Sequence, residues 1–326
     1  MRVTEDMIDP ELRFPAKLIR LAFGKGKASE ERVRRSKTPL SMRVMGRLPQ
    51  RGVSITERYV PRGEGPDLKL VVATRSATAG TKRPGILWIH GGAYSVGTAR
   101  SELSAIRELL GLTDAVFVSP EYRLSTEAPY PAGFDDCYTA LLWLQEHADE
   151  LGVRSDQIIV AGGSAGGGMT AAITIRARNE GKVNVAFQMP LYPMIDDRFT
   201  ASSRDNDAPL YDGTTNESNW RVYLGDLYGG DVPPTAAPAR ETDYRGLPPT
   251  LTFVGGVEPF RDETITYVEN LRAAGVPVEF REFPGAWHGF DSLVPRAKIS
   301  QEAKQWKQER FVRYLATYFA EQPGRS

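Results

Sequence analysis

The sequence contains little cysteine and histidine and no long apolar run, and its formal net charge is zero. Its only cysteine, Cys137, excludes a disulfide within the chain and gives no reason to expect an oxidising compartment. The 41 basic residues balance the 41 acidic ones, which argues against nucleic acid as a partner. No run of about eighteen apolar residues occurs, and acidic residues interrupt the first ten positions, so we expect neither membrane insertion nor a signal peptide. These absences predict a cytoplasmic protein.

Metal and cofactor motifs are also missing. The three histidines, His90, His147 and His288, are dispersed along the chain, and the lone cysteine has no partner motif, so we predict no metal site. No lysine follows the glycine-rich residues 162–168, as a Walker loop would require. A dinucleotide fingerprint threaded through the same residues would lie inside a predicted helix. We therefore expect no cofactor.

Hydrophobic residues make up 41% of the chain, which suffices for one large domain. Period-two alternation over 53–59 and 68–72, separated by a turn rich in proline and glycine, predicts a hairpin at a sheet edge. Apolar runs then alternate with helical patterns. The runs predict strands at 85–90, 115–119, 157–161, 184–189, 250–255 and 277–283, and the helical patterns lie at 101–111, 134–151, 165–179, 262–274 and 299–320. This order predicts an α/β fold with a mostly parallel sheet covered by helices on both faces.

Two segments break the alternation. The N-terminal one has an amphipathic pattern from Leu12 to Ala22 and then a basic stretch at 30–37, which we interpret as a solvated helical face. The other is polar, too long for a structureless loop, and helical in pattern around 217–229. We expect the two segments to pack together as a cap. The predicted division is a catalytic domain at 51–195 and 246–326, with cap segments at 1–50 and 196–245.

A candidate nucleophile lies where a predicted strand meets a predicted helix. The apolar residues 158–161 run into the pentapeptide Gly162-Gly163-Ser164-Ala165-Gly166. A Gly-x-Ser-x-Gly sequence between strand and helix is the setting of a nucleophile elbow, in which the serine occupies a strained corner. Glycines on either side let the strand and the helix pass each other without Cβ clashes. We predict Ser164 as the nucleophile.

A serine hydroxyl needs a base within hydrogen-bond reach. His288 lies in a loop just after the predicted last strand, which satisfies the chain order of serine, acid and histidine. His147 lies at the polar end of a predicted helix, where we interpret it as a surface residue. His288 is therefore the predicted base.

A glycine turn supplies candidate donors for an oxyanion hole. Backbone N–H groups stabilise the charge that develops on a carbonyl oxygen under attack, and glycines leave them unobstructed. Gly91 and Gly92 follow the predicted third strand, and Ala165 directly follows the nucleophile. We predict these three amides as the donors. His90, just before them, is interpreted as bracing the loop.

Five motifs occur in a characteristic order. They are His90-Gly91-Gly92-Ala93; Tyr122-Arg123-Leu124 with Glu127, Pro129, Pro131 and Ala132; Gly162-Gly163-Ser164-Ala165-Gly166-Gly167; Glu258-Pro259-Phe260-Arg261-Asp262-Glu263; and His288-Gly289-Phe290. Together they cover roughly residues 50 to 320, and the chain resembles the hormone-sensitive-lipase-like esterases, the bacterial family IV group. The resemblance implies an α/β-hydrolase with an eight-stranded sheet and a helical cap. It also implies cofactor-free ester hydrolysis, usually of short acyl chains.

The resemblance assigns the acid that orients the base to Glu258, where the family usually has aspartate. Either carboxylate can orient an imidazole, and Asp262 is the alternative acid. Two further positions depart from the family. Ala93 replaces a third glycine but keeps its N–H, and Gly163 replaces the Asp or Thr common before the nucleophile, which leaves the hydrogen bonds of the elbow open.

The predicted function is a serine carboxylesterase acting on short- to medium-chain acyl esters. The same groups would also serve an amidase, a carbamate hydrolase or an acyltransferase, and a non-hydrolytic relative that binds a small molecule is a further alternative. Candidate pocket residues are Tyr94, Tyr192, Trp220 and Tyr223, each at least as well suited to core packing as to a pocket. The expected partner is a small-molecule ester. Relatives often dimerise through the last strand, so we expect a monomer or a homodimer joined at 277–283.

Overall fold

One sheet and the helices around it make up most of the described chain. The computed structural model describes residues 1–23, 28–46, 48, 51–63, 65–75 and 82–324. The strands are β1 (Val53–Val60), β2 (Leu68–Arg75), β3 (Arg83–Ile89), β4 (Val116–Pro120), β5 (Val153–Gly163), β6 (Phe187–Leu191), β7 (Thr250–Gly255) and β8 (Val278–Phe283). The α-helices are α1 (Pro10–Phe23), α2 (Glu30–Arg34), α3 (Leu40–Met45), α4 (Leu103–Leu110), α5 (Ala132–Glu146), α6 (Ala165–Glu180), α7 (Gly213–Leu224), α8 (Arg261–Ala273), α9 (Phe290–Leu293) and α10 (Lys298–Thr317). Short 3₁₀ turns are η1 (Glu5–Met7), η2 (Gly225–Leu227) and η3 (Pro238–Arg240).

The strands form an eight-stranded sheet in the order β1-β2-β4-β3-β5-β6-β7-β8. β2 pairs antiparallel with β1 and β4, and the pairs from β4 to β8 are parallel. The predicted edge hairpin and the mostly parallel sheet are therefore confirmed. Because the parallel strands share one direction, the loops that follow them gather at one end of the molecule.

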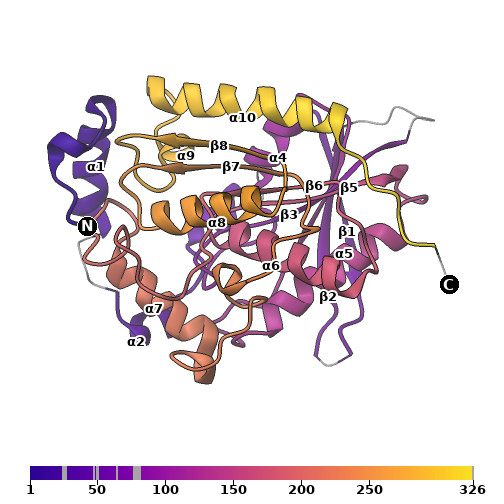
Figure 1. Cartoon of the computed structure of the whole chain (residues 1–326), viewed down its shortest axis with the longest axis horizontal. Coiled ribbons are helices and arrows are strands. Elements are labelled where there is room, and N and C mark those ends of the chain that lie inside the picture. Colours follow the sequence, from indigo (N-terminus) through magenta and orange to yellow (C-terminus); the bar gives the residue numbers. More distant parts are fainter. Residues whose placement is uncertain (24–27, 47, 49–50, 64, 76–81, 325–326) are drawn as a thin grey trace.

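An apolar core lies on each face of the sheet, because successive side chains along a strand point to opposite sides. On β2, Leu70 and Val72 belong to one cluster, whereas Val71 and Ala73 belong to the other. The first cluster includes side chains of α5 and α6, and the second includes side chains of α4 and α10. Figure 1 shows α10 along one side of the sheet and α5, α6 and α8 along the other. Helices thus cover both faces, as the sequence predicts.

The N-terminal segment contacts the insertion between β6 and β7. The Val3 N–H donates to Asp207 Oδ1 at 2.6 Å, and the Arg20 guanidinium donates to the Asp207 carbonyl oxygen at 3.0 Å. The helix α2 packs against α7, and both lie on the same side of the molecule in Figure 1. On α2, Arg34 pairs with Glu30 and is exposed, so the interpretation of the basic stretch as a solvated face is correct over this helix.

The helix predicted at 217–229 begins and ends four or five residues earlier, as α7. Its start is fixed by Asp212, whose side chain accepts a hydrogen bond from the Thr215 N–H. Its end is fixed by Gly225, where the backbone turns to φ 55°. The capping residues, and not the apolar pattern, thus set the bounds of this helix.

Other boundaries also differ from the prediction; β5, for example, starts at Val153, four residues before the strand expected at 157–161. The strand expected at 184–189 is β6, which starts at residue 187, because Asn184 is bonded to the C-terminal segment through Glu321 and Gln322 instead of to the sheet. The helix expected at 134–151 ends before His147, whose backbone leaves the helical region. Within the described residues, no helix combines the length and the apolar character needed to cross a bilayer.

Candidate active site

Ser164 forms a sharp corner between β5 and α6. Its backbone has φ 60° and ψ −124°, a conformation that side chains other than glycine rarely adopt. A Cβ at Gly162 would lie 2.5 Å from the Ile89 carbonyl oxygen, and a Cβ at Gly166 would overlap the same atom. The two glycines therefore let β3, β5 and α6 meet closely enough to place the serine hydroxyl clear of the sheet.

A continuous hydrogen-bonded chain joins Ser164, His288 and Glu258. His288 Nε2 lies 2.9 Å from Ser164 Oγ, and His288 Nδ1 contacts Glu258 Oε2 at hydrogen-bond distance. The second carboxylate oxygen of Glu258 accepts a bond from the Gly255 N–H at 2.6 Å. Glu258 has no exposed surface, and His288 is 6% exposed. The three side chains come from loops after β5, β8 and β7, so the parallel sheet brings them to one end.

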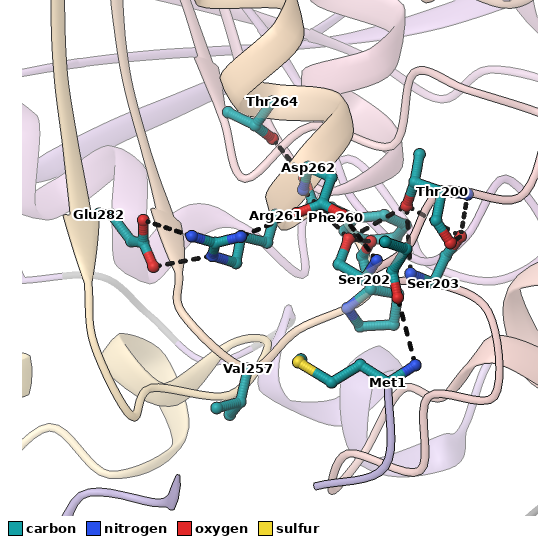
Figure 2. A network of polar contacts seen from close by, with 12 residues as sticks. Met1, Thr200, Ser202, Ser203, Val257, Phe260, Arg261, Asp262, Thr264 and Glu282 are labelled. Carbon is teal, nitrogen blue, oxygen red and sulfur yellow. Dashed lines mark hydrogen bonds and ion pairs between the residues drawn. The ribbon is translucent and has the colours of Figure 1, made fainter.

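Asp262, the alternative acid, has other partners. Its Oδ2 accepts a bond from the Ser202 N–H at 2.7 Å, and its Oδ1 accepts one from the Arg261 guanidinium at 2.8 Å. Figure 2 shows this network, in which Arg261 also pairs with Glu282. Ser202 Oγ in turn donates to the Pro259 carbonyl oxygen at 2.8 Å. Asp262 thus holds the insertion against the loop that carries Glu258, while Glu258 itself faces the imidazole.

The loop after β3 lies directly against the nucleophile. A Cβ at Gly91 would lie 3.5 Å from the Ser164 Cβ. Gly92 has φ 118°, and a side chain there would collide with the Val96 carbonyl oxygen. Burial raises the pKa of the Glu102 carboxyl group, and a hydrogen bond from the Gly91 N–H acts in the opposite direction. The loop therefore brings the backbone of Gly91 next to the nucleophile.

His90 is fully buried beneath this loop. Its Nδ1 is 2.8 Å from the Gly91 carbonyl oxygen, and its ring stacks on Tyr122 with centroids 4.1 Å apart. Burial lowers the pKa of His90 to about 4, so the ring is neutral near neutral pH. These contacts agree with its interpretation as a brace. His147 is half-buried at the end of α5, where its Nδ1 is 3.0 Å from the Trp143 carbonyl oxygen.

Three of the predicted pocket aromatics pack on one another. Tyr94 stacks on Tyr223 with centroids 4.0 Å apart and lies 5.6 Å from Trp220. None of the three is more than 3% exposed, and the Tyr94 hydroxyl donates to the Met194 carbonyl oxygen. The fourth, Tyr192, is half-buried, and its ring centre lies 5.2 Å from that of His288.

Two aromatic neighbours of the His288 imidazole were not predicted from the sequence. Phe260 lies 4.9 Å from His288, and Tyr211 lies 5.7 Å from it, both measured between ring centres. Phe260 is part of the motif that contains Glu258, which was a usable signal. Tyr211 lies in the polar insertion, where no local pattern marks it. With Tyr192, these rings enclose the imidazole on several sides.

Gly163 has a role in this arrangement. A Cβ there would lie 3.0 Å from Cε2 of Tyr192, closer than such an atom normally packs. The absence of a side chain before the nucleophile therefore lets the Tyr192 ring approach the elbow. Among the residues of the described ranges, no cluster of three or more histidine, cysteine or acidic side chains is arranged to hold a metal ion.

Comparisons with known proteins identify the family. The α/β-hydrolase-fold family model matches residues 86–292. The chain is 36% identical over 219 residues to esterase LipI of Mycobacterium tuberculosis, an alignment that covers 66% of this chain and 68% of LipI. It is 37% identical over 222 residues to carboxylesterase NlhH of the same organism, covering 66% and 69% of the two chains.

A solved structure agrees with this relationship. The bacterial heroin esterase superposes with a TM-score of 0.87 at 36% identity, over 96% of this chain and 99% of that one. The match extends over the sheet, the helices and the segments outside them. The chain therefore belongs to the α/β-hydrolase family, in its hormone-sensitive-lipase-like group, and is a carboxylic ester hydrolase.

Proposed function

We propose that the chain hydrolyses esters through an acyl-enzyme on Ser164, with His288 as the base and Glu258 as the acid that orients it. The observation that carries this proposal is the hydrogen-bonded chain from Ser164 Oγ through both ring nitrogens to a carboxylate without exposed surface. His288 Nε2 accepts the serine proton as the hydroxyl attacks the ester carbonyl, and it then donates that proton to the leaving alcohol. Water attacks the acyl-enzyme with the help of the same base, which releases the acid and restores Ser164.

The amides of Gly91, Gly92 and Ala165 are our proposed oxyanion donors. Ala165 is the first residue of α6, and amides in the first turn of a helix have no partner within that helix. Gly91 lies beside the nucleophile, since a Cβ there would be 3.5 Å from the Ser164 Cβ, and Gly92 follows it in the same loop. Each donor contributes about a hundredfold to a thousandfold in turnover.

The proposed substrates are short- to medium-chain acyl esters. The cluster of Tyr94, Trp220 and Tyr223 is closely packed, so we propose that it forms a firm apolar wall instead of a pocket that yields to long chains. Tyr192 contacts the imidazole from the side and is the better placed of the four residues to meet a bound substrate.

The cap, the oligomeric state and the location remain proposals. The bonds from Val3 and Arg20 to Asp207, and the packing of α2 on α7, support a cap made of residues 1–50 and 196–245. The β8 strand lies at the sheet edge, which supports a homodimer through that edge as the alternative to a monomer. Light scattering during gel filtration tests the oligomer, and cell fractionation tests the predicted cytoplasmic location.

Hydrolysis of p-nitrophenyl esters from acetyl to laurate, beside the matched p-nitroanilides, tests the proposed function. We expect the highest kcat/KM at a short or medium chain, slow or no anilide cleavage, and loss of activity in Ser164→Ala. Faster cleavage of the anilides would make the protein an amidase. An inert protein that still reacts with a fluorophosphonate at Ser164 would retain working machinery, and the proposed substrate range would be wrong.

A further inference from the structure

Large apolar side chains on the surface are concentrated near the N-terminus. Thirteen are exposed among the described residues, and seven of them lie in the first 48: Phe14, Leu18, Leu21, Leu40, Met42, Val44 and Leu48. Isolated exposed apolar residues are common on proteins, whereas a concentration of them marks an interaction surface. The N-terminal part of the chain is therefore a candidate interaction surface.

The helix α1 has two apolar faces. Phe14, Leu18 and Leu21 follow one another at intervals of four and three residues, so they share one face of the helix. They are 69%, 52% and 85% exposed, respectively. On the opposite face, Leu12 and Ala16 are buried in the apolar cluster that also includes side chains of α4 and α10. The inner face anchors the helix, and the outer face has no counterpart among the described residues.

The helix α3 repeats this pattern on a smaller scale. Leu40 and Val44 are four residues apart and are 74% and 49% exposed. The end of the helix rests on Arg100, since a Cβ at Gly46 would lie 2.8 Å from the Arg100 Cβ. Just before the helix, the Thr38 hydroxyl donates to the Gly97 carbonyl oxygen. The helix α3 and the residues before it thus pack against the loop that follows β3.

Both helices adjoin loops of the active site. On the α1 side, the Asp9 N–H donates to the Gly285 carbonyl oxygen at 3.0 Å, three residues before His288. On the α3 side, the contacts are with the loop that begins at Gly91. Figure 1 shows α1 at the same end of the molecule as α9, which directly follows His288. The exposed apolar stripes therefore flank the catalytic end of the sheet.

Positive charge is concentrated near the N-terminus, as the exposed apolar side chains are. Residues 1–50 contain twelve Lys or Arg against six Asp or Glu, a net charge of +6, so the rest of the neutral chain carries −6. Lys37 and Arg43 are exposed around α3, and Lys17, which pairs with Glu5 at 2.8 Å, is exposed beside the apolar stripe of α1. An amphipathic helix with apolar and basic side chains on its outer surface is typical of proteins that bind anionic lipid.

We propose that α1 and α3 form a peripheral docking surface for an anionic lipid bilayer. Docking would hold the active-site loops against the membrane, so that esters dissolved in the lipid reach Ser164; this second step rests on the proposed function, whereas binding does not. A second copy of this chain is the other possible occupant. Two surfaces from segments of net charge +6 would repel one another, which favours lipid.

Vesicle co-sedimentation tests the docking surface. The Ser164→Ala protein is mixed with vesicles of phosphatidylcholine, with or without phosphatidylglycerol, and compared with the same protein carrying Leu18→Glu and Leu21→Glu. Both leucines are exposed, so the double variant should fold, and Val312→Glu on α10 is the matched control because Val312 is 45% exposed at a distant site. Circular dichroism and gel filtration with light scattering report folding and oligomeric state.

We expect binding to the phosphatidylglycerol vesicles only, weakened by salt and reduced about tenfold or more by the double substitution but not by Val312→Glu. With Ser164 intact, the double variant should hydrolyse a water-soluble ester as the unsubstituted protein does. Equal sedimentation of the double variant and its parent would overturn the proposal. So would a dimer that the double substitution converts to a monomer without any vesicle binding. If the unsubstituted protein does not hydrolyse the soluble ester, that result would instead count against the proposed function.

Discussion

Lowering the pH from about 7 to about 5 should cost the folded state about 2 kcal/mol through His90 alone. His90 is completely buried, its Nδ1 is engaged by the Gly91 carbonyl oxygen, and burial lowers its pKa from 6.5 to about 4. Below its unfolded pKa of 6.5 the unfolded chain binds a proton that the folded protein does not. Stability is therefore lost as the pH falls from 6.5 towards 4, and the full loss is about 3 kcal/mol at about 1.4 kcal/mol for each pKa unit.

Urea unfolding followed by tryptophan fluorescence measures this effect. The free energy of unfolding is determined between about pH 4 and about pH 8 for the wild type, for His90→Asn and for His147→Asn as the control. Other buried acids such as Glu102 titrate in all three proteins, so their contribution cancels in the differences. On acidification, the free energy of unfolding of the wild type should fall towards that of His90→Asn. The difference in this free energy between the wild type and His147→Asn should stay small.

A difference between wild type and His90→Asn that does not change with pH would refute this reasoning. If His90→Asn does not fold, the imidazole can be followed in the wild type by proton NMR. A His90 signal that titrates near its unfolded pKa in the folded protein would show that burial does not keep the ring neutral.

Three further predictions concern the active site. Glu258→Gln should lower kcat by about 10³- to 10⁴-fold with little change in KM, whereas Asp262→Asn should cost less than about tenfold, as steady-state kinetics will show. Gly166→Ala should destabilise the fold by about 3 kcal/mol or more, because its Cβ would overlap a backbone oxygen of β3, while Gly230→Ala should be tolerated in thermal unfolding. Tyr211→Phe should retain activity, whereas Tyr211→Ala should lower kcat more than it raises KM, since the ring supports the imidazole; equal effects of the two substitutions would contradict this role.

The fold and the nucleophile could be predicted because their signals are local. Four apolar residues, a glycine-flanked serine and a helical pattern follow one another directly, so the corner at Ser164 is encoded within one short stretch. His288 and Glu258 each follow a predicted strand of a parallel sheet, and the common direction of the strands brings them together. Residues that depend on strand ends are therefore accessible to sequence reasoning.

The missed features depend on contacts between distant segments. Tyr211 reaches the imidazole from a polar insertion whose path no periodic pattern specifies. Tyr94 is an aromatic residue in the loop after β3, which suggested a pocket role. Its hydroxyl instead donates to a backbone oxygen within the core. Composition suggests aromatic walls, but only tertiary packing decides which rings remain accessible.

Trapping the acyl-enzyme tests the central claim most directly. The protein is mixed rapidly with p-nitrophenyl butyrate, quenched in acid, and analysed by intact and peptide mass spectrometry beside Ser164→Ala. We expect a burst of nitrophenol and a butyryl mass on the peptide that contains Ser164, both absent from the variant. Turnover at an undiminished rate in Ser164→Ala, or a butyryl group found only on another residue, would contradict it.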